Sequence, residues 1–98
     1  MFVKIHKAYR EIVAVCDSDI LGKQFEEGIK ILDVRENFYK GEEKEKEELV
    51  EFLKDMAMED ATFNIVGKDS VNCALEAGII SQEGVRNVQG IPFALVLL

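Results

Sequence analysis

Two kinds of apolar pattern predict β-strands in this chain of 98 residues. Residues 2–7 alternate between apolar and polar side chains, which is the period of a half-buried strand. Residues 12–16 are apolar throughout, as in a central strand that is buried on both faces. The short connection between these two stretches predicts a hairpin turn. Apolar runs rich in β-branched residues predict four further strands, at residues 29–35, 61–66, 85–88 and 93–98.

Helical spacing is strongest in residues 42–58, where Leu49, Phe52, Leu53 and Met56 fall on one face. The acids of this stretch gather in its first turns, where the helix dipole favours negative charge. We therefore expect an amphipathic helix whose apolar face packs on the core.

A shorter helix is predicted over residues 19–27, because Leu21 and Phe25 lie four positions apart. Gly28 fits the left-handed residue that ends a helix, and Gly78 fits the same role later in the chain. A glycine within residues 19–27 weakens the prediction of a helix there.

The densest local signal is an apolar run that leads into Gly67 and then into a helical pattern. It predicts a strand, a tight turn and a helix with Asp69 or Ser70 as the N-cap. The free amides of such a helix start make Gly67, Lys68 and Ser70 a candidate anion-binding site for a phosphate group. The glycine-rich P-loop pattern is absent, so the alternative is a plain turn followed by a helix cap.

The predicted order of elements, β-β-α-β-α-β-α-β-β, indicates an α+β fold. We expect a single compact domain, residues 1–98, with a mixed β-sheet and about three helices. The chain is 48% hydrophobic and 32% charged, which is typical of a folded domain and not of a disordered one.

The net charge of −7 is concentrated in one region. Residues 42–60 hold nine acids and three lysines, a net charge of −6, which leaves −1 for the remainder of the chain. An acidic total argues against nonspecific coating of nucleic acid, but it is compatible with a local basic surface. The acidic helix at residues 42–58 is a candidate surface for a basic protein partner, and the alternative is a solvated helix face.

The N-terminal residues lack the apolar core of a signal peptide, and no run approaches the roughly 18 apolar residues of a membrane span. We therefore expect a cytoplasmic protein that has no membrane partner. Cys16 and Cys73 each lie in an apolar run, which predicts two reduced, buried thiols and no disulfide. Two separate cysteines and a single histidine make a poor metal set, and we expect neither a metal nor an organic cofactor.

No catalytic signature stands out in the sequence, so we assign no catalytic residue. His6 has no neighbouring serine or aspartate for a nucleophilic site, and a half-exposed strand histidine is the simpler interpretation. Asp17, Asp19 and Asp33 could hold a divalent cation if the fold brings them together. Their spacing matches no calcium loop, and helix capping explains the first two.

Cations and aromatic side chains cluster at the first hairpin and again in residues 36–41, which read as a loop with exposed aromatics. Aromatic rings can stack on unpaired bases while neighbouring cations contact phosphates. The alternative is that Phe38 fills the core and that the lysines are solvated edge residues. The candidate nucleic-acid-binding residues are Lys4, His6, Lys7, Tyr9, Arg10, Tyr39 and Lys40.

Three segments, MFVKIHKAYREIVAVCD, EDATFNIVGKDSV and VQGIPFALVL, resemble the archaeal family called domain of unknown function 424. The resemblance covers essentially the whole chain and rests on the order and wording of these segments, not on a catalytic motif. It implies a small, stand-alone archaeal protein with a role in RNA binding or translation. It supplies no catalytic or binding residues.

We therefore expect a non-enzymatic RNA-binding module associated with translation, whose partner is RNA or a component of the ribosome. Its cations would contact phosphates while Tyr9 or Tyr39 stacks on bases. A protein-interaction module that uses the acidic helix at residues 42–58 is the second hypothesis. Binding of a phosphate or small molecule at the candidate anion site, with or without enzymatic activity, is the third.

Overall fold

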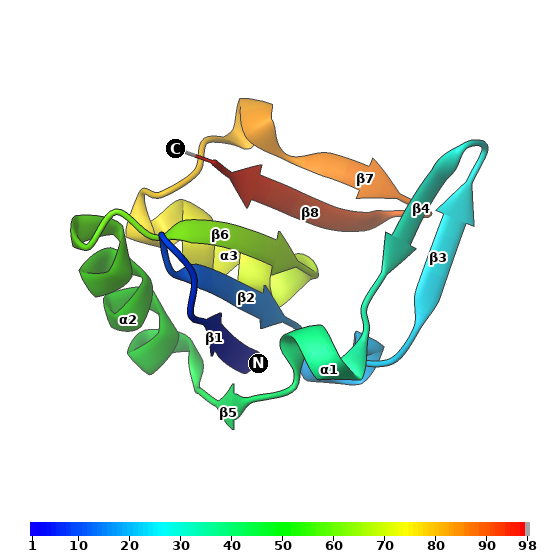
Figure 1. The fold of residues 1–98 in the computed structure, drawn as a ribbon. Helices are drawn as coiled ribbons and strands as arrows, with labels where there is room; N and C mark the ends of the chain where they lie inside the picture. Colours follow the sequence, from blue (N-terminus) through cyan, green and yellow to red (C-terminus); the bar gives the residue numbers. More distant parts are fainter. Residues whose placement is uncertain (98) are drawn as a thin grey trace.

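The computed structural model describes residues 1–97 and is built around a six-stranded β-sheet (Figure 1). The strands of this large sheet are β1 (Phe2–His6), β2 (Ile12–Cys16), β5 (Glu42–Glu43), β6 (Thr62–Val66), β7 (Arg86–Val88) and β8 (Ile91–Val96). They lie in the order β5-β1-β2-β6-β8-β7. β2 and β6 run parallel and the other neighbouring pairs run antiparallel, so the sheet is mixed.

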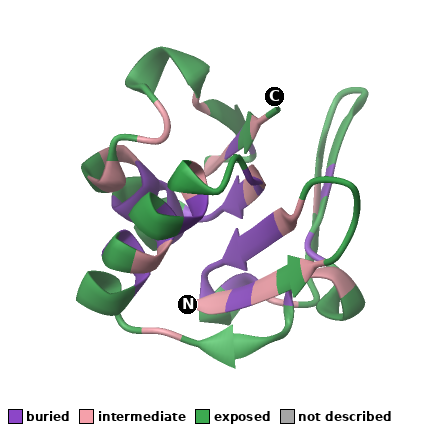
Figure 2. Cartoon of the chain, turned by 60° about the vertical axis from the view of Figure 1, so that its left-hand side comes forward, coloured by how far each residue is buried: buried purple, intermediate pink, exposed green. Residues whose placement is uncertain are grey.

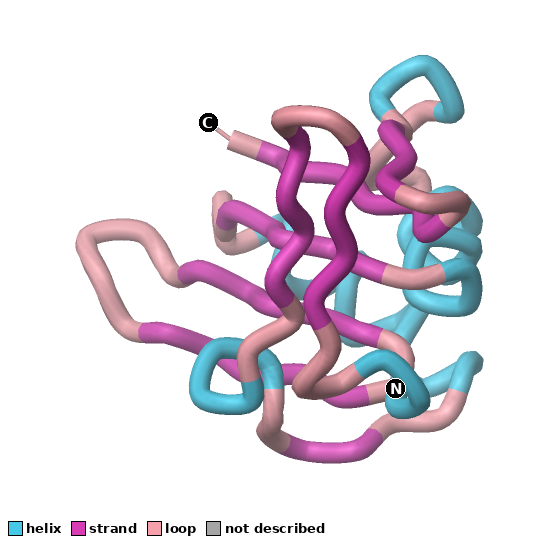
Figure 3. The backbone as a smooth tube through the Cα atoms, turned by 90° about the vertical axis from the view of Figure 1, so that its right-hand side faces the viewer, coloured by secondary structure: helices cyan, strands magenta, loops and turns pink. Residues whose placement is uncertain are grey.

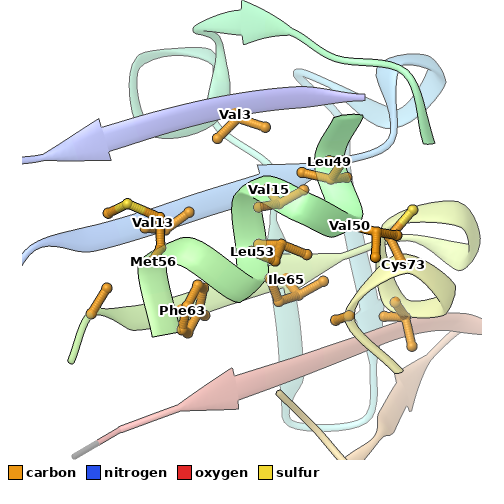
Figure 4. Close-up of a cluster of buried hydrophobic side chains, with 13 residues drawn as sticks. Val3, Val13, Val15, Leu49, Val50, Leu53, Met56, Phe63, Ile65 and Cys73 are labelled. Atoms are coloured by element: carbon orange, nitrogen blue, oxygen red, sulfur yellow. The ribbon is translucent and has the colours of Figure 1, made fainter. Parts of the chain in front are cut away.

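Two helices, α2 (Lys46–Met58) and α3 (Lys68–Ala77), cover one face of the large sheet. Figure 4 shows the core that lies between α2, α3 and the sheet. Leu49, Leu53 and Met56 of α2 are buried there, as the predicted helical stripe requires. The strand side chains that meet them are Val3, Val13, Val15, Phe63 and Ile65.

A separate hairpin and a one-turn helix lie on the opposite face of the large sheet. The hairpin consists of β3 (Gln24–Glu27) and β4 (Lys30–Asp33), and the helix is α1 (Glu36–Tyr39). Figure 3 shows the hairpin crosswise in front of the strands of the large sheet. This hairpin, together with α1, therefore closes a second core on the side away from α2 and α3.

The second core contains the strand residues that alternate with those facing α2. Leu32, Val34 and Tyr39 pack there with Cys16 and Val66 of the central strands. Figure 2 shows the outcome: the central strands are buried, whereas the hairpin is exposed over most of its length. The central strands are therefore buried on both faces, as the apolar run at residues 12–16 predicted.

The α+β class, the mixed sheet and the number of α-helices within residues 1–97 confirm the predicted fold. The predicted strands at residues 2–7, 12–16, 61–66 and 85–88 appear within one residue of their predicted limits. The predicted strand at residues 93–98 begins two residues earlier, and its last residue lies outside the described part of the chain. Gly78 ends α3 with a φ of 77°, as predicted.

The predicted helix at residues 19–27 is wrong. A 3-10 turn, Ser18–Ile20, is followed by Gly22 with a φ of 85° and then by strand β3. Gly28 has a φ of 62° but lies in the turn between β3 and β4, and does not end a helix. A spacing of four residues fits a helix face and a strand face equally, because four is also a multiple of the strand period. Pairing with β4 and packing on the large sheet decide in favour of the strand.

The acidic helix begins at Lys46 and not at residue 42, because Glu42–Glu43 forms β5 on the edge of β1. Residues 36–41 are also corrected: they contain α1, and Tyr39 is only 6% exposed. Gly41 allows the chain to pass close to β1, since a side chain there would place its Cβ 2.2 Å from the Val3 carbonyl oxygen.

Cys16 and Cys73 are both buried and free, which confirms the prediction of two unpaired thiols. Burial raises the pKa of both thiols, that of Cys16 to about 12. Across residues 1–97, no helix has the length and apolar character that a membrane crossing requires.

Candidate nucleic-acid interface

The alternation of β1 sends its polar side chains to the face of the sheet opposite α2. Val3 packs in the core beneath α2, whereas Lys4 and His6 contact α1 on the other side. Val3 and its neighbour Lys4 point in opposite directions because successive side chains of a strand lie on opposite faces of the sheet. The sequence pattern at residues 2–7 therefore determines that two candidate side chains, Lys4 and His6, share one surface.

α1 is held to β1 by these same two side chains. Lys4 Nζ donates to the carbonyl oxygen of Asn37 at 2.8 Å, and His6 Nε2 lies 2.8 Å from that of Phe38. Because a carbonyl can only accept, His6 Nε2 carries the hydrogen in this contact. Lys40 N donates to the Glu36 carbonyl at 2.8 Å. The carbonyl groups of a helix end need such partners, so Lys4 and His6 have a structural role as well.

The ring of His6 stacks on that of Phe38, with centroids 4.5 Å apart and planes inclined by 17°. Phe38 in turn meets Tyr39 edge-on, with centroids 5.0 Å apart at 77°. The prediction that Phe38 is either a core plug or an exposed aromatic therefore has an intermediate outcome. Phe38 is half-buried and packs against the second core, and it joins β1 to α1 at the surface.

The loop between β1 and β2 carries the remaining candidates of the hairpin. Lys7 forms an exposed ion pair with Glu11, and Arg10 Nη1 donates to the Asp60 carbonyl oxygen at 3.3 Å. Tyr9 is fully exposed. Lys7, Tyr9 and Arg10 follow Lys4 and His6 directly along the chain, and Arg10 reaches toward the residues that follow α2.

Tyr39 and Lys40, the two candidates from residues 36–41, have different environments. Lys40 is exposed after α1, whereas Tyr39 packs in the second core. Burial, with smaller contributions from the charges of Cys16 and Asp33, raises the pKa of Tyr39 to about 12. The phenol is therefore neutral at ordinary pH, and the largely buried ring of Tyr39 is not free to stack on both sides.

The acids of α2 lie across the sheet from Lys4 and His6, because α2 packs on the face to which Val3 points. Around β5, Lys44 Nζ pairs with Glu42 at 2.8 Å and lies 4.9 Å from the centre of the Phe52 ring. The hydrogen bond to Glu42 raises the pKa of Lys44 and lowers that of Glu42. These contacts anchor the start of the acidic region without using any of the candidate cations.

The candidate anion site at Gly67, Lys68 and Ser70 contains an internal carboxylate. Asp17 accepts hydrogen bonds from Asp69 N at 3.1 Å, from Ser70 N at 2.8 Å and from Ser70 Oγ at 2.7 Å. The predicted capping by Asp69 or Ser70 is wrong, because Asp17 at the end of β2 acts as the cap. The donors that a phosphate would need are taken, so we do not carry this hypothesis further.

Asp17, Asp19 and Asp33 do not form a cation site. Within residues 1–97, no group of three or more His, Cys, Asp or Glu side chains could hold a metal ion. The predicted capping of a helix at Asp19 is wrong, because neither Asp17 nor another side chain caps the 3-10 turn at Ser18–Ile20, and the Asp17 carboxylate caps α3 instead.

A protein-family model described as "Protein of unknown function (DUF424)" matches residues 6–98 of the chain. The chain belongs to this family. The resemblance to domain of unknown function 424 is therefore confirmed, and it gives no activity.

A solved structure, "Crystal structure of an uncharacterized conserved protein from Methanopyrus kandleri", superposes on this fold with a TM-score of 0.86. It is 21% identical in sequence, and the match covers 97% of this chain and 88% of that one. This similarity shows that the two proteins share a fold. No curated protein matches the chain.

The comparisons therefore support a family and a fold but no site, and the geometry has to identify one. Sequence reasoning missed Arg35 and gave Asp33 and Phe38 other roles. These three residues line an open pocket of about 320 Å³ together with Tyr39. The alternation of Asp33 and Arg35 with buried Leu32 was a signal that both point away from the core. Only the fold shows that β4 lies beside α1.

Proposed function

We propose that this protein is a non-enzymatic RNA-binding module that acts in translation or RNA metabolism, with single-stranded or looped RNA as its ligand. The binding surface consists of β1, the loop between β1 and β2, and α1. The single observation that carries the proposal is that Lys4 and His6 lie on the opposite side of the sheet from the acids of α2. A basic surface can therefore exist on a chain whose net charge is −7.

The composition of this surface favours single-stranded or looped RNA over a double helix. Lys4, Lys7, Arg10 and Lys40 supply donors for phosphate oxygens, and fully exposed Tyr9 supplies a ring for an unstacked base. Proteins that bind single strands combine such cations with stacking aromatics. Sequence-specific RNA recognition generally targets loops and single strands, because their bases are accessible.

We also infer a cytoplasmic, archaeal protein. Two free, buried cysteines agree with a reducing compartment. An archaeal origin agrees with the source of the structural relative from Methanopyrus kandleri. The same proposal names RNA or a ribosomal component as the partner.

A salt titration of binding to a short, unstructured RNA tests the proposal. Fluorescence anisotropy of a labelled RNA should show affinity that falls steeply with salt, because each neutralised phosphate releases counterions. In the double variant Lys7→Ala/Arg10→Ala, the salt slope should become shallower by about 1.4, at about 0.7 per lost contact with a single strand. Tyr9→Ala should weaken binding by about 1 to 3 kcal/mol if the ring stacks on a base.

The double variant Lys46→Ala/Lys54→Ala provides the matched control. It removes the same positive charge from α2, on the other side of the sheet, and both lysines are exposed. Its salt slope should equal that of the wild type. Absence of binding at low salt, or equal losses in both double variants, would remove the RNA proposal.

A second candidate function is supported by a pocket of about 270 Å³ between β1 and α2. Ile5 is 38% exposed there, and half-buried Phe52 lies beside it. β5 pairs only with Phe2 and Val3, so the edge of β1 beyond them is open for an extended segment. The acids of α2 favour a basic protein partner, as in the acidic-helix hypothesis.

Titration with an extended peptide of alternating lysine and valine tests this second candidate. Binding should be lost in Ile5→Asp and weakened by salt, while Lys7→Ala/Arg10→Ala binds as the wild type does. If the peptide binds both Ile5→Asp and the wild type equally, the edge of β1 is not its site.

A further inference from the structure

The pocket of about 320 Å³ between β4 and α1 has two charged and two aromatic walls. Asp33 and Arg35 form the charged side, and Arg35 Nε donates to Asp33 Oδ2 at 3.0 Å. Phe38 and Tyr39 form the aromatic side. Phe38 also stacks on His6, which belongs to the surface proposed to bind RNA. An RNA strand bound along β1 would therefore lie beside the pocket.

The charged pair has no role in the core. Leu32 and Val34, which alternate with Asp33 and Arg35, are the residues buried against the large sheet. The Arg35 side chain is 68% exposed and that of Asp33 is 39% exposed. Exposed pairs of this kind contribute little to stability, so their placement beside two rings needs another reason.

The aromatic side is held rigidly. Phe38 is fixed between His6, which stacks on it, and Tyr39, which meets it edge-on. Tyr39 is anchored in the second core with a neutral phenol. A preformed wall of this kind costs a ligand little ordering entropy when it binds.

The chemistry of the charged side selects among nucleobases. A carboxylate can only accept hydrogen bonds, and a guanidinium plane can stack on a base. Guanine presents two adjacent donors, N1–H and the 2-amino group, and therefore matches a carboxylate. Uracil flanks its one donor with two carbonyl acceptors, which a carboxylate repels. Adenine and cytosine each offer one amino donor beside a ring acceptor.

We propose that this pocket binds one unstacked base of the RNA and prefers guanine, with Asp33 accepting from its Watson–Crick edge and Arg35 and Phe38 contacting its ring. This inference rests on the proposed RNA-binding function and deepens it, because it adds base preference to phosphate contacts. Lys7, Tyr9 and Arg10 then determine affinity, whereas Asp33 determines which base is bound.

Binding of short uridine-rich RNAs that differ only in one central base tests the pocket. The wild type should bind the guanine-containing RNA about tenfold more tightly than the all-uridine RNA, as expected for one well-placed pair of base contacts. Inosine, which lacks the 2-amino group, should give an intermediate affinity. Asp33→Asn should lose the preference for guanine while its affinity for the all-uridine RNA is unchanged or slightly higher.

Asp55→Asn is the matched control, because it removes one exposed acid from α2 on the far side of the sheet. It should keep the preference for guanine. Equal binding of all four bases by the wild type, or a preference for guanine that survives in Asp33→Asn, would refute the proposed guanine pocket and leave the RNA-binding proposal standing. If none of the RNAs binds, the proposed function and the pocket fall together.

Discussion

Asp17→Ala should lower the free energy of unfolding by about 3 kcal/mol, because Asp17 caps α3 from the end of β2, a distant segment of the chain. Asp17 is 8% exposed, and its carboxylate accepts three hydrogen bonds, two from Ser70 and one from Asp69 N. Ser70 is completely buried, so its amide has no access to water once the acceptor is removed. Asp69 N lies nearer the surface, and water can replace Asp17 there.

The magnitude follows from these environments. A buried amide left without an acceptor costs about 1 to 3 kcal/mol, and loss of an N-cap costs about 0.5 to 2 kcal/mol. The Ser70 hydroxyl can rotate to another partner, so we add nothing for it. Asp17→Asn should cost less than Asp17→Ala, because the amide oxygen still accepts from Ser70 while its nitrogen faces the Asp69 amide.

Urea unfolding followed by circular dichroism measures the change. With a slope of about 1.5 kcal/mol per molar urea, a loss of 3 kcal/mol lowers the midpoint by about 2 M. Asp69→Ala is the matched control, since it removes an acid from the first turn of the same helix but no cap. It should cost less than about 1 kcal/mol, the limit for an exposed charge near a helix end.

The outcome distinguishes capping by Asp17 from local capping. If Asp69→Ala costs more than Asp17→Ala, or Asp17→Ala costs less than about 1 kcal/mol, the assignment of Asp17 as the cap is refuted. Gly67→Ala gives an independent check, because a Cβ there lies 2.3 Å from Asp17 Cγ at a φ of 110°. We expect it to destabilise by more than the about 1 to 3 kcal/mol that an unusual backbone conformation alone costs.

Three further results are expected. Leu53→Ala should cost about 2 to 5 kcal/mol in urea unfolding, since Leu53 is fully buried, whereas exposed Glu45→Ala should change stability by less than about 0.5 kcal/mol. Thiol labelling of native protein should be slow at Cys16 and Cys73 and fast after unfolding, and rapid labelling of both would contradict their burial. Burial raises the pKa of Cys16 from 9.0 and that of Tyr39 from 10.0, each to about 12. Both groups therefore hold their protons more tightly when folded, so the unfolding free energy should fall as pH rises from about 9 to 12, and a flat profile would contradict this.

Local sequence patterns were sufficient to predict an element and its buried face wherever one face of that element packs on one core. Residues 2–7 alternate because β1 contacts α2 on one side and α1 on the other, and this alternation is visible in the sequence. The stripe of α2 repeats at the helical period for the same reason. Burial on one face imposes a period on the sequence, and the period can be read without knowing the partner.

Residues 19–27 show where local patterns fail. Phe25 pairs with Leu32 across the hairpin, and both side chains contact strands that are distant in sequence. The segment itself has no strand signal of its own, and its spacing of apolar residues suits a helix equally well. The strand is favoured over the helix because the hairpin packs on the face of the large sheet that α2 and α3 leave uncovered, and only the complete fold defines that face.

The candidate site divides in the same way. The sequence by itself determined that Lys4 and His6 share one face, because β1 alternates, and that the acids concentrate in one helix. Only the tertiary structure decided that Tyr39 is buried and that Asp17 takes the amides of α3. It alone decided that Asp33 and Arg35 lie beside the rings of α1. Side-chain direction follows from the local backbone period, whereas contacts between distant segments follow from how the elements share two cores.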